Sequence, residues 1–182
     1  MSTFLGGSHA TVEERSLLVR AQAGDQAAFA ALLEPHRRML QSLCLRIVGD
    51  PHEAEDALQL TLLAAWQHLD RFEGRSKLST WLYRIAHNSA LSVARKRKAE
   101  PGGDAFDDLV SGAADPERVA DVDAVQRALA QLPPDFRAAI VLREFHDMSY
   151  ADIAAVQGIK IETVKTRINR GRQALHRLLS VG

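Results

Sequence analysis

Five side chains near the end of the chain could read the edges of DNA bases. They lie on one face of a predicted helix and are Glu162, Thr166, Asn169, Arg170 and Gln173. Arginine can pair with two acceptors of guanine, and asparagine or glutamine with adenine, so this set suits the major groove. Three cations flank the face where they could reach phosphates, namely Lys165, Arg167 and Arg172.

A predicted helix pair positions this face. Ser149 followed three residues later by Asp152 resembles a capping box, and Gly158 ends the short helix that they open. A second helix from about Ile161 then turns Val164 and, four residues on, Ile168 inward. Two helices joined by a short glycine turn predict a helix-turn-helix unit. The alternative is that such a pair is a plain element of a helical core.

A second basic segment, RFEGRSKLSTWLYRIAHN (71–88), combines cations with Phe72, Trp81 and Tyr83. Basic side chains follow the backbone of single-stranded nucleic acid while aromatic faces stack on its unpaired bases. The alternative is that Phe72 and Trp81 fill a small core. The cluster at 95–98 continues the same predicted helix and suits duplex phosphates.

The predicted helix 51–70 is apolar on two sides. One stripe consists of Leu58, Leu62, Ala65 and Leu69, and on the other side Leu60 and Leu63 stand among polar residues. Exposed leucines beside polar groups favour a protein-docking surface. A helix buried on both faces would give the same pattern.

The elements that carry these residues predict an all-α fold of two small helical domains. Asp25, Asp50 and Ser149 can each cap a helix, Pro35 interrupts the first long pattern, and no strand alternation of useful length is visible. The stretch 100–117 has two prolines, three glycines and many acids, which predicts a flexible acidic linker.

Charge supports the same division. The net charge is zero, but residues 71–98 hold eight basic and one acidic side chain, 99–123 hold one basic and eight acidic, and 158–177 hold six basic and one acidic. Two basic segments around an acidic one favour nucleic-acid binding, and this pattern is more informative than the average charge. The alternative is that these charge runs are solvated surface.

No arrangement of side chains predicts an enzyme, a metal site or a cofactor. The seven histidines are scattered, and the single cysteine, Cys44, lies among aliphatic residues where a buried thiol is expected. Nuclease activity is the rival class, and we expect no cleavage in the presence of divalent metal. The first residues lack the pattern of a secretory signal and no long apolar run occurs, so we expect a cytoplasmic protein without membrane insertion.

Taken together, the segments resemble bacterial RNA polymerase sigma factors. The stretches that resemble region 2 are GDQAAFAALLEPHRRML, RIVGDPHEAEDALQLTLLAAW and FEGRSKLSTWLYRIAHNSALSVARKRK. The stretch that resembles region 4 is ALAQLPPDFRAAIVLREFHDMSYADIAAVQGIKIETVKTRINRGRQAL. With only these two regions and a short linker, the chain is similar to the extracytoplasmic-function (ECF, group 4) sigma factors over about residues 11–179.

This resemblance implies a protein that binds core polymerase and directs promoter-specific initiation, with region 2 at 1–98, a linker at 99–115 and region 4 at 116–182. The polymerase-binding residues that it implies are Asp56, Gln59, Leu60, Leu63 and Gln67. Those implied for the −10 element are Phe72, Arg75, Ser76, Lys77, Ser79, Thr80, Trp81, Arg84, Asn88 and Arg95. Those implied for the −35 element are Glu162, Thr163, Lys165, Thr166, Arg167, Asn169, Arg170, Arg172 and Gln173.

The implied partners are the β and β′ subunits of core polymerase and promoter DNA, both as duplex and as melted single strand. An anti-sigma factor is a further candidate partner, and we expect a monomer when the protein is free. Three positions depart from the family pattern: Leu60 and Ser92 where acids are common, and Lys160 where proline or serine often opens the recognition helix. The alternative function is a stand-alone helix-turn-helix regulator that needs no polymerase.

Overall fold

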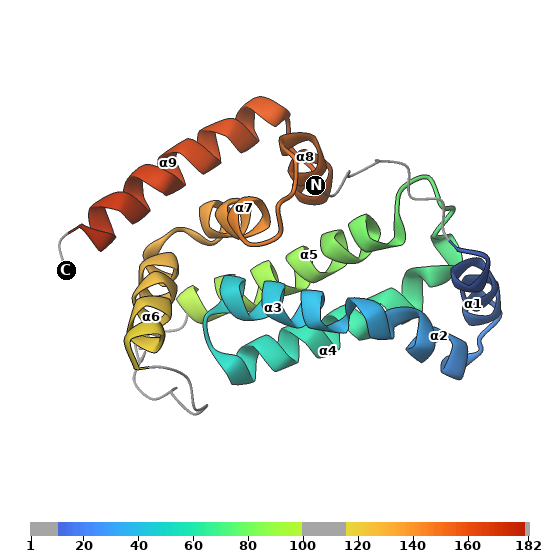
Figure 1. The fold of residues 1–182 in the computed structure, drawn as a ribbon. Helices are drawn as coiled ribbons and strands as arrows, with labels where there is room; N and C mark the ends of the chain where they lie inside the picture. Colours follow the sequence, from blue (N-terminus) through green and yellow to red (C-terminus); the bar gives the residue numbers. More distant parts are fainter. Residues whose placement is uncertain (1–10, 100–115, 181–182) are drawn as a thin grey trace, which may run out of the picture.

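A computed structural model of the chain describes the backbone of residues 11–99 and 116–180, with the side chains of 11–97 and 124–180 (Figure 1). All regular structure in these ranges is helical, which confirms the all-α prediction. The helices are α1 (Val12–Gln22), α2 (Gln26–Leu33), the short 3-10 turn η1 (Glu34–His36), α3 (Arg37–Val48), α4 (Pro51–His68), a second 3-10 turn η2 (Leu69–Arg71), α5 (Leu78–Ala99), α6 (Pro116–Gln131), α7 (Pro134–Glu144), α8 (Tyr150–Gln157) and α9 (Ile161–Leu179). The acidic linker predicted at 99–115 falls, from residue 100 on, outside the described residues.

The helix boundaries follow local chemistry. Asp25, Asp50 and Ser149 each occupy the N-cap and accept a hydrogen bond from the backbone N–H three residues later, which satisfies a donor that the helix leaves free. Pro35 stands between α2 and α3, where a 3-10 turn replaces α-helix, as the sequence predicts. Gly158 ends α8 at a φ of 66°, a conformation that glycine adopts at little cost.

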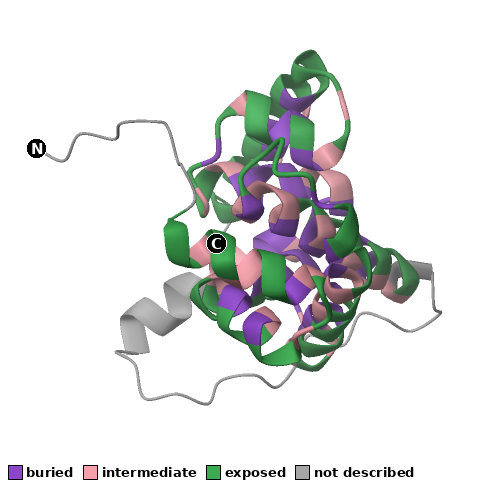
Figure 2. Cartoon of the chain, turned by 90° about the vertical axis from the view of Figure 1, so that its right-hand side faces the viewer, coloured by how far each residue is buried: buried purple, intermediate pink, exposed green. Residues whose placement is uncertain are grey.

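Helices α3, α4 and α5 form the centre of the N-terminal group, and α1 and α2 close one end of it (Figure 1). Its fully buried large side chains come from all three central helices and include Leu40, Leu43, Ile47, Leu58 and Leu82. Cys44 is buried among them, as predicted, and burial raises the pKa of its thiol to about 11. Figure 2 shows the buried residues gathered on the inward faces of the helices.

In the C-terminal group, α9 packs on α7 and α8. Val164 and Ile168 are both fully buried, so the aliphatic stripe predicted for the basic helix faces the core. Ile140 of α7 and Ile153 of α8 belong to the same cluster of buried side chains. This packing fixes which side of α9 points outward.

The two groups also pack on each other, an arrangement that the sequence did not predict. Helix α7 lies on α3 and α5, and α8 lies on α5 (Figure 1). Arg137 of α7 is buried between the two groups of helices. It donates hydrogen bonds to the carbonyl oxygens of Ile47, Ala130 and Leu132. Burial lowers its pKa to about 10, so the guanidinium remains charged at neutral pH. None of the described helices is long and apolar enough to cross a membrane.

Candidate nucleic-acid interface

Helix α4 presents one buried and one exposed side. Ala57, Leu58 and Ala65 are buried against α3 and α5. All five predicted polymerase-binding residues are exposed, and we call this set the α4 face: Asp56, Gln59, Leu60, Leu63 and Gln67. Leu60 and Leu63 are 49 % and 53 % exposed, which is high for leucine. Within the described chain, helix α4 is therefore not buried on both sides.

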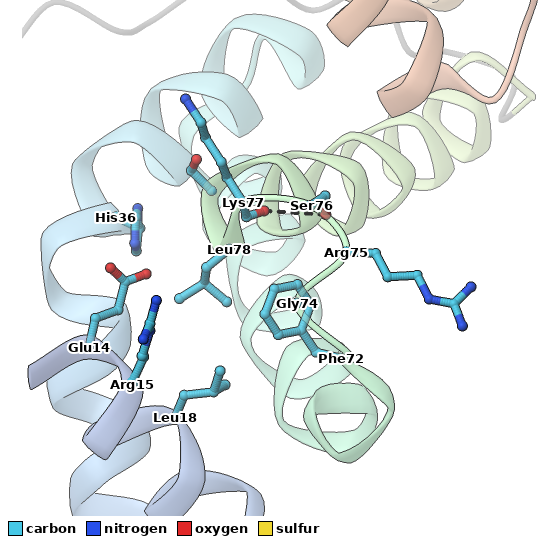
Figure 3. Close-up of a pocket in the computed structure, with 11 residues that line it drawn as sticks. Glu14, Arg15, Leu18, His36, Phe72, Gly74, Arg75, Ser76, Lys77 and Leu78 are labelled. Carbon is cyan, nitrogen blue, oxygen red and sulfur yellow. Dashed lines mark hydrogen bonds between the residues drawn. The ribbon is translucent and has the colours of Figure 1, made fainter. Parts of the chain in front are cut away.

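The loop between η2 and α5 borders a hollow of about 640 Å³ (Figure 3). The loop side contributes predicted −10 residues, namely Phe72, Arg75, Ser76, Lys77 and Ser79. Gly74 stands in the loop with a φ of 71°, which lets the chain turn sharply before α5. Arg75 is highly exposed and pairs with the neighbouring Glu73, at 2.6 Å. This volume lies in the range of pockets that hold small ligands.

The other wall of the hollow was missed by the sequence analysis. It consists of Glu14, Arg15 and Leu18 of α1 together with His36 of η1. A signal was present in the sequence, because Thr11 followed three residues later by Glu14 fits a capping box, and Thr11 does accept from the Glu14 N–H. Burial lowers the pKa of His36, with the Glu14 charge opposing that shift. The imidazole therefore favours its neutral form and can both donate and accept.

The aromatic residues of this region pack more than they protrude. Phe72 is 9 % exposed, and its ring centroid lies 5.3 Å from that of Trp81. Trp81 is half-buried. The core interpretation therefore accounts for Phe72, which also lines the hollow, and Trp81 retains part of its surface for other contacts.

Along α5, the remaining predicted −10 residues differ in exposure. Thr80 is half-buried, whereas Arg84, Asn88 and Arg95 are exposed at spacings that keep them on one side of the helix. Arg95 is already paired: its Nη2 donates to both carboxylate oxygens of Asp135 on α7, at 2.9 Å each.

On α9 the predicted −35 residues lie on the outward side. All but one are exposed, the set being Glu162, Thr163, Lys165, Thr166, Asn169, Arg170, Arg172 and Gln173. Arg172 also donates to Glu144 of α7, at 2.6 Å from its Nη2. The exception is Arg167, which is only 20 % exposed and donates to Gln157 at 3.0 Å. The helix thus offers amide, guanidinium and hydroxyl groups outward, the set suited to base edges.

The described residues contain no cluster of three or more histidine, cysteine or acidic side chains that could hold a metal ion. The titratable histidines with shifted pKa values, apart from His36, lie between the two groups of helices: burial lowers the pKa of His87, and it lowers that of His146 to about 4.

Comparison with known families and proteins finds similarity in both groups of helices. The family model for sigma-70 region 2 matches residues 32–100, and that for sigma-70 region 4 matches residues 123–175. The chain is 34 % identical to the ECF RNA polymerase sigma factor SigW of Bacillus subtilis, with 88 % of this chain and 93 % of that protein covered. It is 37 % identical to the RNA polymerase sigma-H factor of Pseudomonas aeruginosa, over 92 % and 94 % of the two chains.

Two solved structures share the fold. CnrH, determined in complex with the cytosolic domain of CnrY, superposes with a TM-score of 0.70 at 28 % identity, covering 93 % of this chain and 98 % of CnrH. The sigma factor RpoE of Bartonella quintana, determined in complex with the anti-sigma factor NepR, gives a TM-score of 0.67 at 34 % identity, over 84 % and 97 % of the two chains.

Proposed function

Because the chain belongs to the extracytoplasmic-function sigma factors of bacterial RNA polymerase, we propose that three surfaces have separate roles in promoter-specific initiation. They are the α4 face, the −10 surface formed by the hollow and α5, and the outward side of α9. The protein is a sigma factor: it binds RNA polymerase and directs transcription initiation, without catalysis of its own. The subunits contacted, the DNA elements read and the residues that do so form our proposal. We place region 2 at residues 1–98, the linker at 99–115 and region 4 at 116–182.

The α4 face binds the β′ subunit of core polymerase. Its opposite side is buried in the domain, so the exposed Leu60 and Leu63 are free to bury their remaining surface against a partner. Burying apolar surface contributes about 25 cal/mol per Å², enough for two leucines to anchor a contact rimmed by the polar residues beside them. Leu60, where the family often has an acid, adds apolar area to this face. The exposed leucine pair is the observation that carries the proposal.

The hollow beside the 72–77 loop receives an unpaired base of the melted −10 element. Taking a base out of the stack costs a few kcal/mol, which is recovered when the base enters a pocket of matching shape. Leu18 and Leu78 supply apolar surface in the hollow, while Arg75 and Lys77 stand where the strand's phosphates would pass (Figure 3). Arg84, Asn88 and Arg95 continue this −10 surface along α5.

The outward side of α9 reads the −35 element in the major groove. Asn169 and Arg170 are central to it and have the geometry for adenine and guanine edges, with Thr166 beside them. Lys165 and Arg172 flank them and position the helix on phosphates.

Two further partners belong to the proposal. The β subunit would receive region 4, and an anti-sigma factor would hold the free protein inactive. The anti-sigma factor is supported by the similar sigma factor RpoE of Bartonella quintana, which was determined in complex with the anti-sigma factor NepR. We place this activity in the cytoplasm, with the free protein a monomer.

In-vitro transcription with purified core polymerase tests the proposal. The protein, core polymerase and a library of genomic fragments should together yield discrete transcripts that neither protein yields alone. A stand-alone regulator would bind duplex DNA but give no transcript. The absence of any promoter-specific product on the whole library would overturn the roles proposed for these surfaces.

A further inference from the structure

The side-chain amide of Gln22, the last residue of α1, ties that helix to the loop that borders the hollow. Its Nε2 donates to the carbonyl oxygen of Leu69 at 2.9 Å and to that of Phe72 at 3.0 Å. A primary amide nitrogen carries two hydrogens, so these two bonds use its whole donor capacity. Gln22 stands 47 and 50 positions before its two partners, so the tertiary fold, and not a local turn, makes this contact.

The amide helps to fix the point at which the 72–77 loop begins. Phe72 directly follows η2, and its buried ring packs against that of Trp81, so both the ring and the carbonyl of this residue are held. At the other end of the loop, Leu78 is buried and opens α5. Residues 73–77 between these anchors are all exposed. The conformation of the loop therefore depends on how its two ends are held.

Gln22 is itself held in place by the tight turn that joins α1 to α2. Nη2 of Arg20 donates to Oδ2 of Asp25 at 2.6 Å, and the backbone N–H of Asp25 donates to the carbonyl oxygen of Arg20. Gly24 makes the turn possible with a φ of 94°, and Ala21 anchors the end of α1 in the core. The amide is thus carried by a fixed backbone.

Helix α1 contributes to the hollow a second time, through its side chains. Glu14 and Leu18 line the hollow and stand eight and four residues before Gln22, a spacing that places all three on one side of the helix (Figure 3). One side of α1 therefore forms a wall of the hollow, and its last residue holds the start of the loop that borders the same hollow.

We propose that Gln22 is a positioning residue for base capture: it holds the 72–77 loop in the conformation in which the hollow accepts an unpaired base. This rests on the function proposed above. A loop that is ordered in advance loses less conformational freedom when its ligand binds, so its affinity is higher. Without the amide, the carbonyls of Leu69 and Phe72 would turn to water and the loop would have to be ordered during capture. Gln22 acts through the loop, because it is not among the residues that line the hollow.

Gln22→Met and Gln22→Glu, made in the full chain, test this role. Methionine keeps the length of the side chain but cannot donate, and ionised glutamate keeps both length and polarity but only accepts. Gln26→Met is the matched control, since it makes the same chemical change at an exposed position in the first turn of α2. Circular dichroism shows whether the helices of each variant are intact, and pull-down shows whether each binds core polymerase equally.

The probe is a promoter recovered in the transcription experiment above, with mismatches that hold its −10 element open. A matched series of templates lacks one base of the opened stretch at a time and keeps the sugar–phosphate backbone. Polymerase carrying the wild-type protein should bind one template of this series more weakly than the intact template, which identifies the captured base.

On the intact template, both Gln22 variants should bind about three- to tenfold more weakly than Gln26→Met, the range expected for the loss of one or two hydrogen bonds. On the template that lacks the captured base, wild type, the Gln22 variants and the control should all bind alike.

Equal affinity of the Gln22 variants and Gln26→Met for the intact template would overturn the role of Gln22. An equal loss on the intact template and on the template without the captured base would do the same, because a general weakening of the domain does not depend on the base. A loss in Gln22→Met alone would assign the effect to polarity and not to donation. If removal of no single base weakens binding of the wild type, base capture in the hollow fails instead.

Discussion

Gly171 of α9 lies against Ile140 of α7 so closely that a Cβ placed on the glycine would stand 2.7 Å from Cγ1 of the isoleucine. Real Cβ atoms do not approach a carbon this closely, so any larger residue would force the Ile140 side chain to shift. The contact sits between Ile168 and Leu175 on the inward side of α9, and it lets α9 pack directly on α7. The tilt of α9, and with it the aim of Asn169 and Arg170, depends on this approach.

Replacing Gly171 by alanine should destabilise region 4. Overpacking typically costs about 1–3 kcal/mol, and alanine recovers about 0.5–1 kcal/mol through its better helix propensity. The net expectation is a loss of about 1 kcal/mol, measured as a lower thermal midpoint of the full chain. Gln173→Ala, on the exposed side of the same helix, is the control and should leave the midpoint unchanged or slightly higher. A midpoint for Gly171→Ala at or above that of the control would contradict this packing argument.

The helices could be predicted because their signals are local. Asp50 followed by Pro51 marks a helix start and Gly158 marks an end, and the spacing of Val164 and Ile168 identifies the buried side of α9. The two-sided leucine pattern of α4 could be predicted for the same reason, since the helical period places Leu58 and Leu60 on different sides, but the period left open whether the second side is exposed.

The hollow and the contact between the two groups could not be predicted in this way. His36 and Lys77 line one hollow although they are far apart in the sequence, and Asp135 meets Arg95 across the linker. No periodicity within one helix encodes which side of another helix it meets. Thr11 and Glu14 did carry a local capping signal, so the start of α1 could have been predicted from the sequence. The position of α1 beside His36 could not.

Changing Leu63 to aspartate should abolish binding to core polymerase while the helical circular dichroism signal stays intact. The side chain is 53 % exposed, so the charge does not disturb the domain's own core, but it would be buried unpaired at the interface. Val19→Asp, at a 65 % exposed aliphatic position of α1, is the matched control and should bind normally. Pull-down with core polymerase measures the effect. Unfolding of Leu63→Asp would instead assign this leucine to the core.

Changing Arg170 to alanine should weaken recognition of the −35 element by about 1–3 kcal/mol, the worth of one bidentate contact with a base. Arg177→Ala, an exposed arginine two turns further along α9, controls for loss of charge. Duplexes with and without the element, compared in a fluorescence anisotropy titration, separate the two roles. A loss that is equal on specific and random duplexes would make Arg170 a phosphate contact.

Changing Glu14 to glutamine should relax the choice of base at one position of the −10 element. A carboxylate accepts from the exocyclic amino group of cytosine, whereas glutamine both donates and accepts and so discriminates less. Transcription from a promoter library randomised through the −10 element measures the preference at each position. Glu13→Gln, one residue away and outside the lining of the hollow, should keep the wild-type preference. Identical base preferences in Glu14→Gln and wild type would remove Glu14 from the reading of the base.

The free energy of unfolding should decrease as the pH falls from about 6.5 towards 4. Burial first, and the charge of Arg46 second, lower the pKa of His146 to about 4, against the opposing charge of Asp147. An unfolded histidine titrates near 6.5, so the unfolded chain takes up the proton first and the stabilisation, present above 6.5, is lost on the way down to 4. His87, whose pKa burial also lowers, acts in the same direction.

His146→Asn tests this dependence, because the asparagine amide can replace Nδ1 in its contact with Tyr83 and does not titrate. Thermal midpoints at pH 7.5, 5.5 and 4.5 should fall less steeply for this variant than for wild type. Carboxylates also titrate across this range, but they do so in both proteins and cancel in the comparison. His176→Asn, at an exposed position of α9, should follow the wild-type curve. Parallel curves for His146→Asn and wild type would show that the buried imidazole does not govern the acid sensitivity of the folded protein.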